Sequence, residues 1–200
     1  RGFNEQECVD SVNGALALRP QIEKAVDQLW EECFDRIFFV GIGGTYASAL
    51  QVEVYFRGRS ALDVHAENAA EYLTTGNRRL TSRSVVVYSS VSGDTKEMVE
   101  MVAKVKAQGA RVLAFIDTPG STLTQPGQWD HLVLYPKNEQ LKFYMAANYL
   151  MYKNGEFPEY ARYNQEMETY LSKGLGSIEK IADACALRYA KSKAEFLQAH

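Results

Sequence analysis

Two turns rich in glycine, serine and threonine carry the residues best suited to chemistry in this 200-residue chain. Each follows an apolar run and precedes a segment with helical periodicity, within residues 38–50 and 85–99. Glycine lets backbone N–H groups approach an anion closely, and a helix that begins there directs its positive dipole end at the same point. The hydroxyl-bearing residues of the second turn are Ser89, Ser90, Ser92 and Thr95. No lysine of the Walker type follows, so the turns predict a neutral pocket for a phosphate or carboxylate.

The first turn differs from a dinucleotide-binding motif. Gly41, Gly43 and Gly44 form G-x-G-G, but the third glycine of G-x-G-x-x-G would fall at Tyr46. No acidic residue ends the next apolar run in the manner that binds a ribose. One such turn is more often an ordinary tight loop than a site. Two of them on successive strands favour an anion site.

The turns belong to an alternating series of strands and helices. Five apolar runs have the length of strands: residues 36–42, 61–65, 84–90, 111–117 and 131–135. Helical segments at 46–57 and 95–108 lie between them, and continuous apolar runs such as 112–116 are typical of strands covered on both faces. This alternation predicts an α/β fold with a doubly wound, five-stranded parallel sheet. Ligands of such sheets bind beyond the carboxyl ends of the strands, where both turns then lie.

Helical patterns flank this region on both sides. Residues 4–32 have helical periodicity that is interrupted at Arg19-Pro20. After residue 136 the pattern is helical only, with segments at 140–152, 158–171 and 177–199. We expect tyrosines in these segments to pack in the core or at an interface. Residues that could pack against a further domain are Phe143, Tyr144, Leu150 and Met151.

The pattern divides the chain into three parts. N-terminal helices that pack on the domain occupy residues 1–35, a ligand-binding domain occupies residues 36–157, and a helical connector occupies residues 158–200. Because the last helix has no capping residue or loop after it, we expect the chain to be a fragment of a longer protein.

Composition excludes several classes of function. Hydrophobic residues make up 46% of the chain and charged residues 24%, which is ordinary for a globular domain. The net charge of −3 gives no basic footprint for nucleic acid or anionic lipid. Cys8, Cys33 and Cys185 have the spacing of neither a disulfide framework nor a metal site, and no apolar stretch has membrane-span length. We expect a cytoplasmic protein with no metal, no nucleic-acid partner and no membrane contact.

Three segments together resemble the sugar isomerase (SIS) domain family: GGTYASAL, SSVSGDT and FIDTPGSTLTQ. The resemblance covers about residues 36–155, and its most specific element is S-x-S-G-[DE]-T at 90–95. It implies that Ser90, Ser92 and Thr95 hold the phosphate of a phosphosugar and that Thr45 touches the sugar. The other substrate-binding positions that it implies are Gly43, Gly44, Val91 and Gly93. At Val91 the isomerase half of glucosamine-6-phosphate synthase has a glutamine, so here a side-chain contact is lost while the backbone amide remains.

Within this family, AENAAEY at residues 66–72 and the helical tail look most like fructosamine-6-phosphate deglycases. Those enzymes cleave a phosphorylated Amadori product into glucose 6-phosphate and an amine. They resemble the synthase isomerase half in having two SIS domains in tandem, with the proton-transferring residues mainly in the second. The resemblance therefore implies the first SIS domain of a longer enzyme, a phosphosugar substrate, and a homodimer or higher homo-oligomer.

Candidate proton-transferring residues follow the second predicted strand. Aldose–ketose conversion and Amadori cleavage both move a proton next to a carbonyl or imine, which needs a carboxylate or histidine poised near neutral pH. Neither reaction needs a metal or an organic cofactor. His65, Glu67 and Glu71 are the candidates, although both glutamates are better explained as the acidic first turn of a short helix. We predict Glu71 as the catalytic one, because related SIS domains have a glutamate near this place in the sugar pocket.

Two alternatives to an enzyme stay open. SIS domains also act as phosphosugar sensors in bacterial transcription regulators, which would be expected to carry a basic helix-turn-helix segment. Residues 4–32 contain seven acidic and two basic residues, which disfavours that function. The other alternative is an isolated domain with no activity of its own. Lys96, Trp129 and His131 are better explained by surface exposure or packing than by chemistry.

Overall fold

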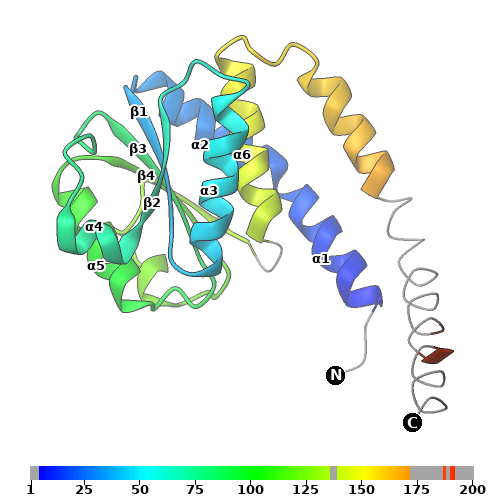
Figure 1. Cartoon of the computed structure of the whole chain (residues 1–200), viewed down its shortest axis with the longest axis horizontal. Helices are drawn as coiled ribbons and strands as arrows, with labels where there is room; N and C mark the ends of the chain where they lie inside the picture. Colours follow the sequence, from blue (N-terminus) through cyan, green and yellow to red (C-terminus); the bar gives the residue numbers. More distant parts are fainter. Residues whose placement is uncertain (1–4, 136–138, 172–186, 188–189, 192–200) are drawn as a thin grey trace.

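A five-stranded parallel sheet forms the centre of the domain (Figure 1). The computed structural model describes residues 5–135, 139–171, 187, 190 and 191. The strands are β1 (Arg36–Gly41), β2 (Val64–Asn68), β3 (Ser84–Ser90), β4 (Arg111–Ile116) and β5 (His131–Leu134). They stand in the order β2-β1-β3-β4-β5, and each neighbouring pair is parallel. The predicted doubly wound parallel sheet is confirmed.

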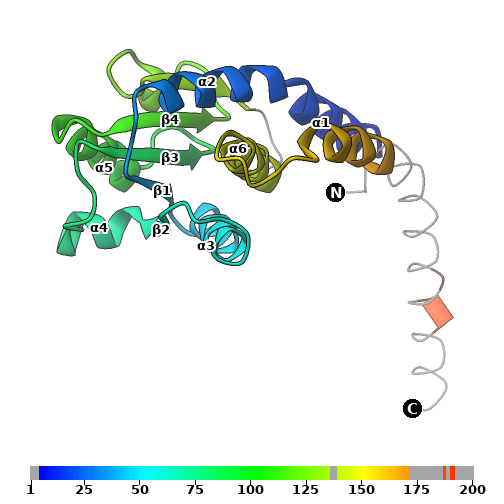
Figure 2. The same cartoon turned by 90° about the horizontal axis from the view of Figure 1, so that it is seen from above.

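Helices cover both faces of the sheet (Figure 2). The helices are α1 (Glu5–Ala17), α2 (Arg19–Glu31), α3 (Gly44–Arg57), α4 (Ala69–Thr75), α5 (Lys96–Ala107) and α6 (Glu139–Lys153), with a short 3-10 helix η1 (Thr122–Thr124). Residues of α2, α3 and α6 pack on one face, and residues of α4 and α5 pack on the other. Residues 160–171 are also helical, whereas the helix predicted at 177–199 lies almost entirely outside the described residues.

Alternating side chains of the strands pack in two separate hydrophobic cores, one on each face of the sheet. In β1, Ile37 and Phe39 belong to the core beneath α2, α3 and α6, while Phe38 and Val40 belong to the core beneath α4 and α5. Successive strand residues point to opposite faces, so a strand covered on both faces must be apolar at every position. The three-layer arrangement thus explains the continuous apolar runs in the sequence.

The second strand begins and ends three residues later than predicted. The sequence predicts residues 61–65, but β2 spans Val64–Asn68 and pairs with β1 from Ile37↔Val64 to Gly41↔Asn68. As an edge strand it is partly exposed, so polar residues occupy it and no apolar run marks its end. His65 and Glu67 therefore lie within the strand, and their expected place beyond it is wrong.

Helix α6 packs on its own sheet. Phe143, Leu150 and Met151 are buried in the core, and the ring of Phe143 lies 5.3 Å from that of Phe39. The expectation that these three residues are available to a further domain is therefore wrong, whereas Tyr144 is only partly buried. The apolar face of the helix is used by the domain itself.

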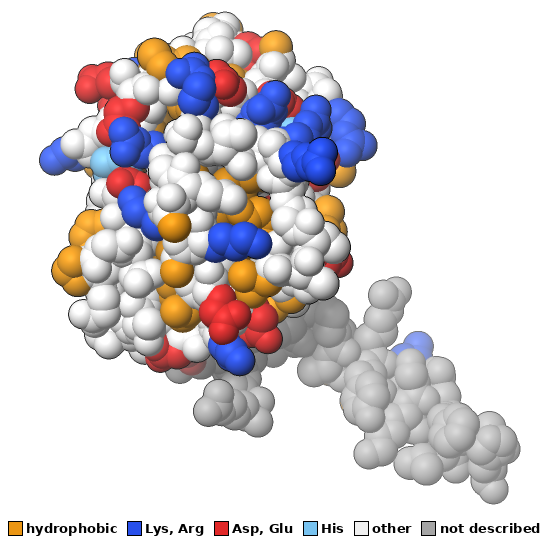
Figure 3. Space-filling model, turned by 90° about the vertical axis from the view of Figure 1, so that its left-hand side faces the viewer, with side chains coloured by type: hydrophobic (Ala, Val, Ile, Leu, Met, Phe, Trp, Pro, Cys, Tyr) orange, Lys and Arg blue, Asp and Glu red, His pale blue; other side chains and the backbone are white. Residues whose placement is uncertain are grey.

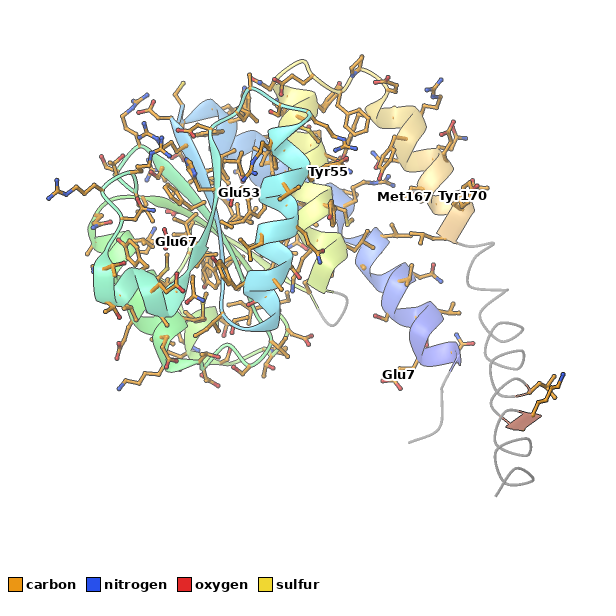
Figure 4. All side chains as sticks on the ribbon, in the orientation of Figure 1. Glu7, Glu53, Tyr55, Glu67, Met167 and Tyr170 are labelled. Atoms are coloured by element: carbon orange, nitrogen blue, oxygen red, sulfur yellow. The ribbon has the colours of Figure 1, made fainter. Side chains whose placement is uncertain are left out.

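The tyrosines of the helical region pack mostly against each other and against α2. The rings of Tyr149, Tyr152 and Tyr160 pack together with centroid distances between 5.1 and 5.6 Å, and Tyr152 stacks on both of the others. The Tyr160 hydroxyl donates to Glu23 and the Tyr149 hydroxyl to Asp27. Tyr170, labelled in Figure 4, differs in being 81% exposed.

No helix in the described part of the chain is long and apolar enough to cross a membrane.

Replacing Phe39 by alanine is expected to reduce the free energy of unfolding by about 3–5 kcal/mol, because the ring joins β1 to α3 and α6 through Phe56 and Phe143. Val54→Ala on the exposed face of α3 is the control, with an expected change within about 0.5 kcal/mol. Urea denaturation of both variants measures the difference. Equal effects of the two substitutions would contradict this account of the core.

Candidate functional site

A cavity of about 340 Å³ lies at the carboxyl ends of β1 and β3, between the first turns of α3 and α5. The chain leaves β1 toward β2 on one side and leaves β3 toward β4 on the other, so this is the point where the sheet reverses its winding. The volume is in the range of small-molecule sites. The residues that line it are Ile42, Gly44, Thr45, Ser89, Ser90, Val91, Ser92, Thr95 and Met98.

The two glycine- and serine-rich turns therefore meet at one place, as their positions after neighbouring strands predict. Of the predicted binding residues, Gly43 and Gly93 do not line the cavity but shape the turns, both with positive φ. Ile42, Ser89 and Met98 also line it. The sequence analysis named Ser89 as a hydroxyl of the second turn, but it predicted none of these three as a binding residue. Met98 follows Thr95 by three residues in α5, and that helical spacing is the signal that could have identified it.

In the first turn, the Thr45 hydroxyl closes the loop on itself. Its Oγ1 accepts from the N–H of Ile42 and donates to the Ile42 carbonyl, both at 2.9 Å. Gly43 is the N-cap residue of α3 and offers no side-chain cap to the helix. Thr45 thus fixes the turn and still presents an oxygen lone pair at the cavity wall.

In the second turn, hydroxyls bond to the loop that they belong to. The Ser90 Oγ accepts from the N–H of Gly93 at 3.0 Å, and the Ser92 and Thr95 hydroxyls lie 3.2 Å apart. Thr95 is the N-cap residue of α5 but makes no side-chain bond to the helix. The first N–H groups of a helix have no hydrogen-bond partner within the helix. Those of α5 also have no side-chain cap, and they point out of its N-terminal end, where the cavity lies.

The segment after β4 supports the second turn from behind. Asp94 Oδ1 accepts from the N–H of Thr122 at 2.8 Å, and the N–H of Leu123 donates to the Gly93 carbonyl at 2.9 Å. The Thr118 hydroxyl donates to the Val91 carbonyl at 2.8 Å. The hydrogen bond from the Thr122 backbone lowers the pKa of Asp94 below its usual value. These bonds hold the loop in place without filling the cavity.

The cavity wall carries no charged side chain. All of its lining residues are neutral, and Lys96 lies on the exposed side of α5, 3.8 Å from Glu100. Figure 3 shows the left-hand side of the molecule as drawn in Figure 1, and acidic and basic side chains are interspersed on that side. An anion bound here is therefore held by hydroxyls, backbone N–H groups and the dipole of α5.

The predicted catalytic residue Glu71 does not line the cavity. It lies exposed in the first turn of α4, where its N–H donates to the Asn68 side chain. Glu67 in β2 is half-buried and accepts from Asn77 Nδ2 at 2.6 Å, and burial is the main cause that raises its pKa. Figure 4 shows Glu67 on β2 and Glu53 on α3. The pKa of Tyr46 is raised mainly by burial, and to a smaller extent by the nearby carboxylates of Glu71, Glu67 and Glu53.

The structure describes two histidines, His65 and His131, and neither lines the cavity. His65 Nε2 lies 2.8 Å from Asp63 Oδ1, and its ring is 5.3 Å from that of Phe38. His131 at the start of β5 is partly buried, and burial lowers its pKa. Within the described ranges, no group of three or more His, Cys, Asp or Glu residues could hold a metal ion.

Comparison with known proteins gives a family match and relatives of known activity. Residues 32–151 match the family model of the SIS domain. The chain is 27% identical over 121 residues to the glutamine–fructose-6-phosphate aminotransferase (isomerizing) of Bacillus subtilis, which is 60% of this chain and 19% of that enzyme. It is 27% identical over 110 residues to the fructosamine deglycase FrlB of Bacillus subtilis, which is 54% of this chain and 34% of the deglycase. The chain thus spans about a third or less of these relatives.

A solved structure shares the fold. The C-terminal domain of glucosamine-fructose-6-phosphate aminotransferase from Francisella tularensis superposes with a TM-score of 0.60 at 16% identity. The superposition covers 72% of this chain and 43% of that structure. At this identity the likeness concerns the fold and not the ligand.

Gly93→Ala is expected to disrupt the second turn. Gly93 has φ +70°, and an added Cβ would lie 1.9 Å from the Ser121 Oγ. We expect a loss of about 2–4 kcal/mol in the free energy of unfolding, from backbone strain and from the steric clash together. Chemical denaturation of the purified variant measures this loss.

The matched control is Gly120→Ala. Gly120 has φ +79° but nothing within 4 Å of the added Cβ, so this variant carries the backbone strain without the clash. Its expected cost is about 1 kcal/mol. If the two variants unfold at the same denaturant concentration, the clash with Ser121 is not a constraint on the loop.

Proposed function

This chain belongs to the SIS domain family, and we propose that it is the phosphosugar-binding domain of an enzyme that acts on an amino-linked ketose 6-phosphate. The reaction that we favour is deglycation of a fructosamine 6-phosphate, with aldose–ketose isomerisation of a phosphosugar as the related possibility. The observation that carries the proposal is the neutral, hydroxyl-lined cavity at the uncapped N-terminus of α5. The similarity to a fructosamine deglycase supports the choice of substrate class.

In this proposal the phosphate group binds at the α5 end of the cavity. The hydroxyls of Ser90, Ser92 and Thr95 and the N–H groups of the first helical turn surround that position. Val91 contributes its backbone N–H in place of a side chain. The sugar then extends toward Gly44 and Thr45 in the first turn of α3. A phosphate held at one end orients the reacting carbons at the other, which supplies binding energy remote from the chemistry.

Proton transfer is proposed to involve Glu71 together with groups outside this chain. Glu71 follows β2, whose last residue Asn68 pairs with Gly41 at the end of β1. It therefore lies at the same edge of the sheet as the cavity, displaced from it by one strand. A carboxylate in that place serves the far end of an extended substrate. We also propose that the protein forms a homodimer, acts in the cytoplasm and uses no cofactor.

Titration calorimetry with glucose 6-phosphate and fructose 6-phosphate tests the phosphate site in the full-length protein. Ser92→Ala combined with Thr95→Ala is expected to weaken binding by about 100-fold, because each hydroxyl contributes a hydrogen bond to a charged group. The control is Thr74→Ala combined with Thr75→Ala, which removes two exposed hydroxyls of α4 outside the cavity. Unchanged affinity in the first double variant would reject the assignment.

Release of glucose 6-phosphate from fructoselysine 6-phosphate separates an enzyme from a sensor. We expect the full-length protein to release glucose 6-phosphate in a coupled dehydrogenase assay, and Glu71→Gln to slow the release by about 10²-fold or more. Binding of the phosphosugar without any turnover would favour the sensing module instead. Full activity of the Glu71 variant would exclude that residue from proton transfer.

A further inference from the structure

Ser89 at the carboxyl end of β3 has a buried hydroxyl group with no hydrogen-bond partner among the described residues. The residue is 1% exposed and lines the cavity. The other hydroxyls of the cavity wall, those of Thr45, Ser90, Ser92 and Thr95, each have a partner. Burying an unsatisfied hydroxyl costs free energy, and such groups are nearly always bonded in folded proteins. The hydroxyl without a partner thus belongs to a residue that forms part of the cavity wall.

Ser89 and Ser90 point to opposite faces of the sheet. Val85 and Val87 belong to the core on the α3 side, and Val86 and Tyr88 belong to the core on the α5 side. Strand alternation places Ser89 on the α3 side and Ser90 on the α5 side. Ser90 therefore lies with the proposed phosphate position, while Ser89 lies on the side of the cavity from which the Thr45 turn extends.

We propose that Ser89 is a specificity-determining residue that hydrogen-bonds a hydroxyl group on the carbon chain of the bound phosphate ester. The inference rests on the proposed function, because it assumes that the phosphate occupies the α5 end. A serine hydroxyl both donates and accepts, which suits a sugar hydroxyl. A site with a buried polar group rejects an analogue that lacks the matching hydroxyl, since the group then stays unsatisfied. Ser89 thereby favours a polyhydroxylated chain over an apolar one.

Calorimetry on the full-length protein with three ligands tests this role. The ligands are glucose 6-phosphate, n-propyl phosphate, which has no hydroxyl on its carbon chain, and inorganic phosphate. Ser89→Ala is expected to weaken binding of glucose 6-phosphate by about three- to tenfold, the contribution of one hydrogen bond. Binding of the other two ligands is expected to change by less than about twofold, because their phosphate contacts are intact. The ligand-free variant is expected to unfold at a temperature about 2–4 °C higher, since an unsatisfied hydroxyl is removed.

Tyr88→Phe is the matched control. The Tyr88 hydroxyl is also buried without a partner in the described structure, but Tyr88 does not line the cavity. This variant is expected to gain thermal stability in the same way and to bind all three ligands like the unchanged protein. A larger loss of glucose 6-phosphate affinity in Tyr88→Phe than in Ser89→Ala would overturn the inference.

The remaining outcomes are equally decisive. Unchanged glucose 6-phosphate affinity in Ser89→Ala, or an equal loss for all three ligands, would show that Ser89 does not select the carbon chain. A lower unfolding temperature would show that its hydroxyl has a structural partner, and would also overturn the inference. If the unchanged protein binds none of the three ligands, the proposed function itself fails.

Discussion

The parallel pairing of β1 with β3 is the constraint on which the site depends. The register from Arg36↔Ser84 to Val40↔Tyr88 brings the ends of both strands to the same edge of the sheet. The chain then continues into α3 on one face and α5 on the other, so the first turns of these helices open apart above one point. The cavity is the space that this divergence leaves. Its lining comes from two segments more than forty residues apart, which no local interaction holds together.

A neutral site depends on rigid geometry more than a charged one does. A lysine attracts a phosphate over several ångströms, whereas hydroxyl and N–H groups act at hydrogen-bond distance and in particular directions. The turn at 91–95 must therefore hold its shape without the ligand. The bonds from Thr118, Thr122 and Leu123 supply this support from the segment after β4. This explains why the third segment of the sequence signature belongs to the site although it lies behind the cavity wall.

The sequence allowed the sheet and the two turns to be predicted because both follow from local patterns. Buried parallel strands leave long apolar runs, and the turns between strand and helix need glycine and hydroxyl residues. The edge strand β2 was misplaced, because its position is set by pairing with β1 and not by its own polar residues. Met98 could have been identified from its helical spacing to Thr95, whereas the place of Ser89 in the cavity wall depends on which face of β3 meets the cavity. That choice depends on the packing of the whole domain, and a single sequence does not contain it as a pattern.

This cavity has polar groups without a protein partner for a physical reason, although other such groups, including Gln128 Oε1 and His131 Nε2, lie elsewhere. A binding site must keep donors and acceptors free for its ligand, so it loses stability that a fully bonded interior would have. The uncapped N-terminus of α5 and the hydroxyl of Ser89 are both of this kind. Tyr88 shows that an unbonded hydroxyl is not sufficient, because its group is buried in the core and does not line this cavity. The informative observation is that a polar group without a partner belongs to a residue of the cavity wall, since only there can a ligand supply the missing hydrogen bond.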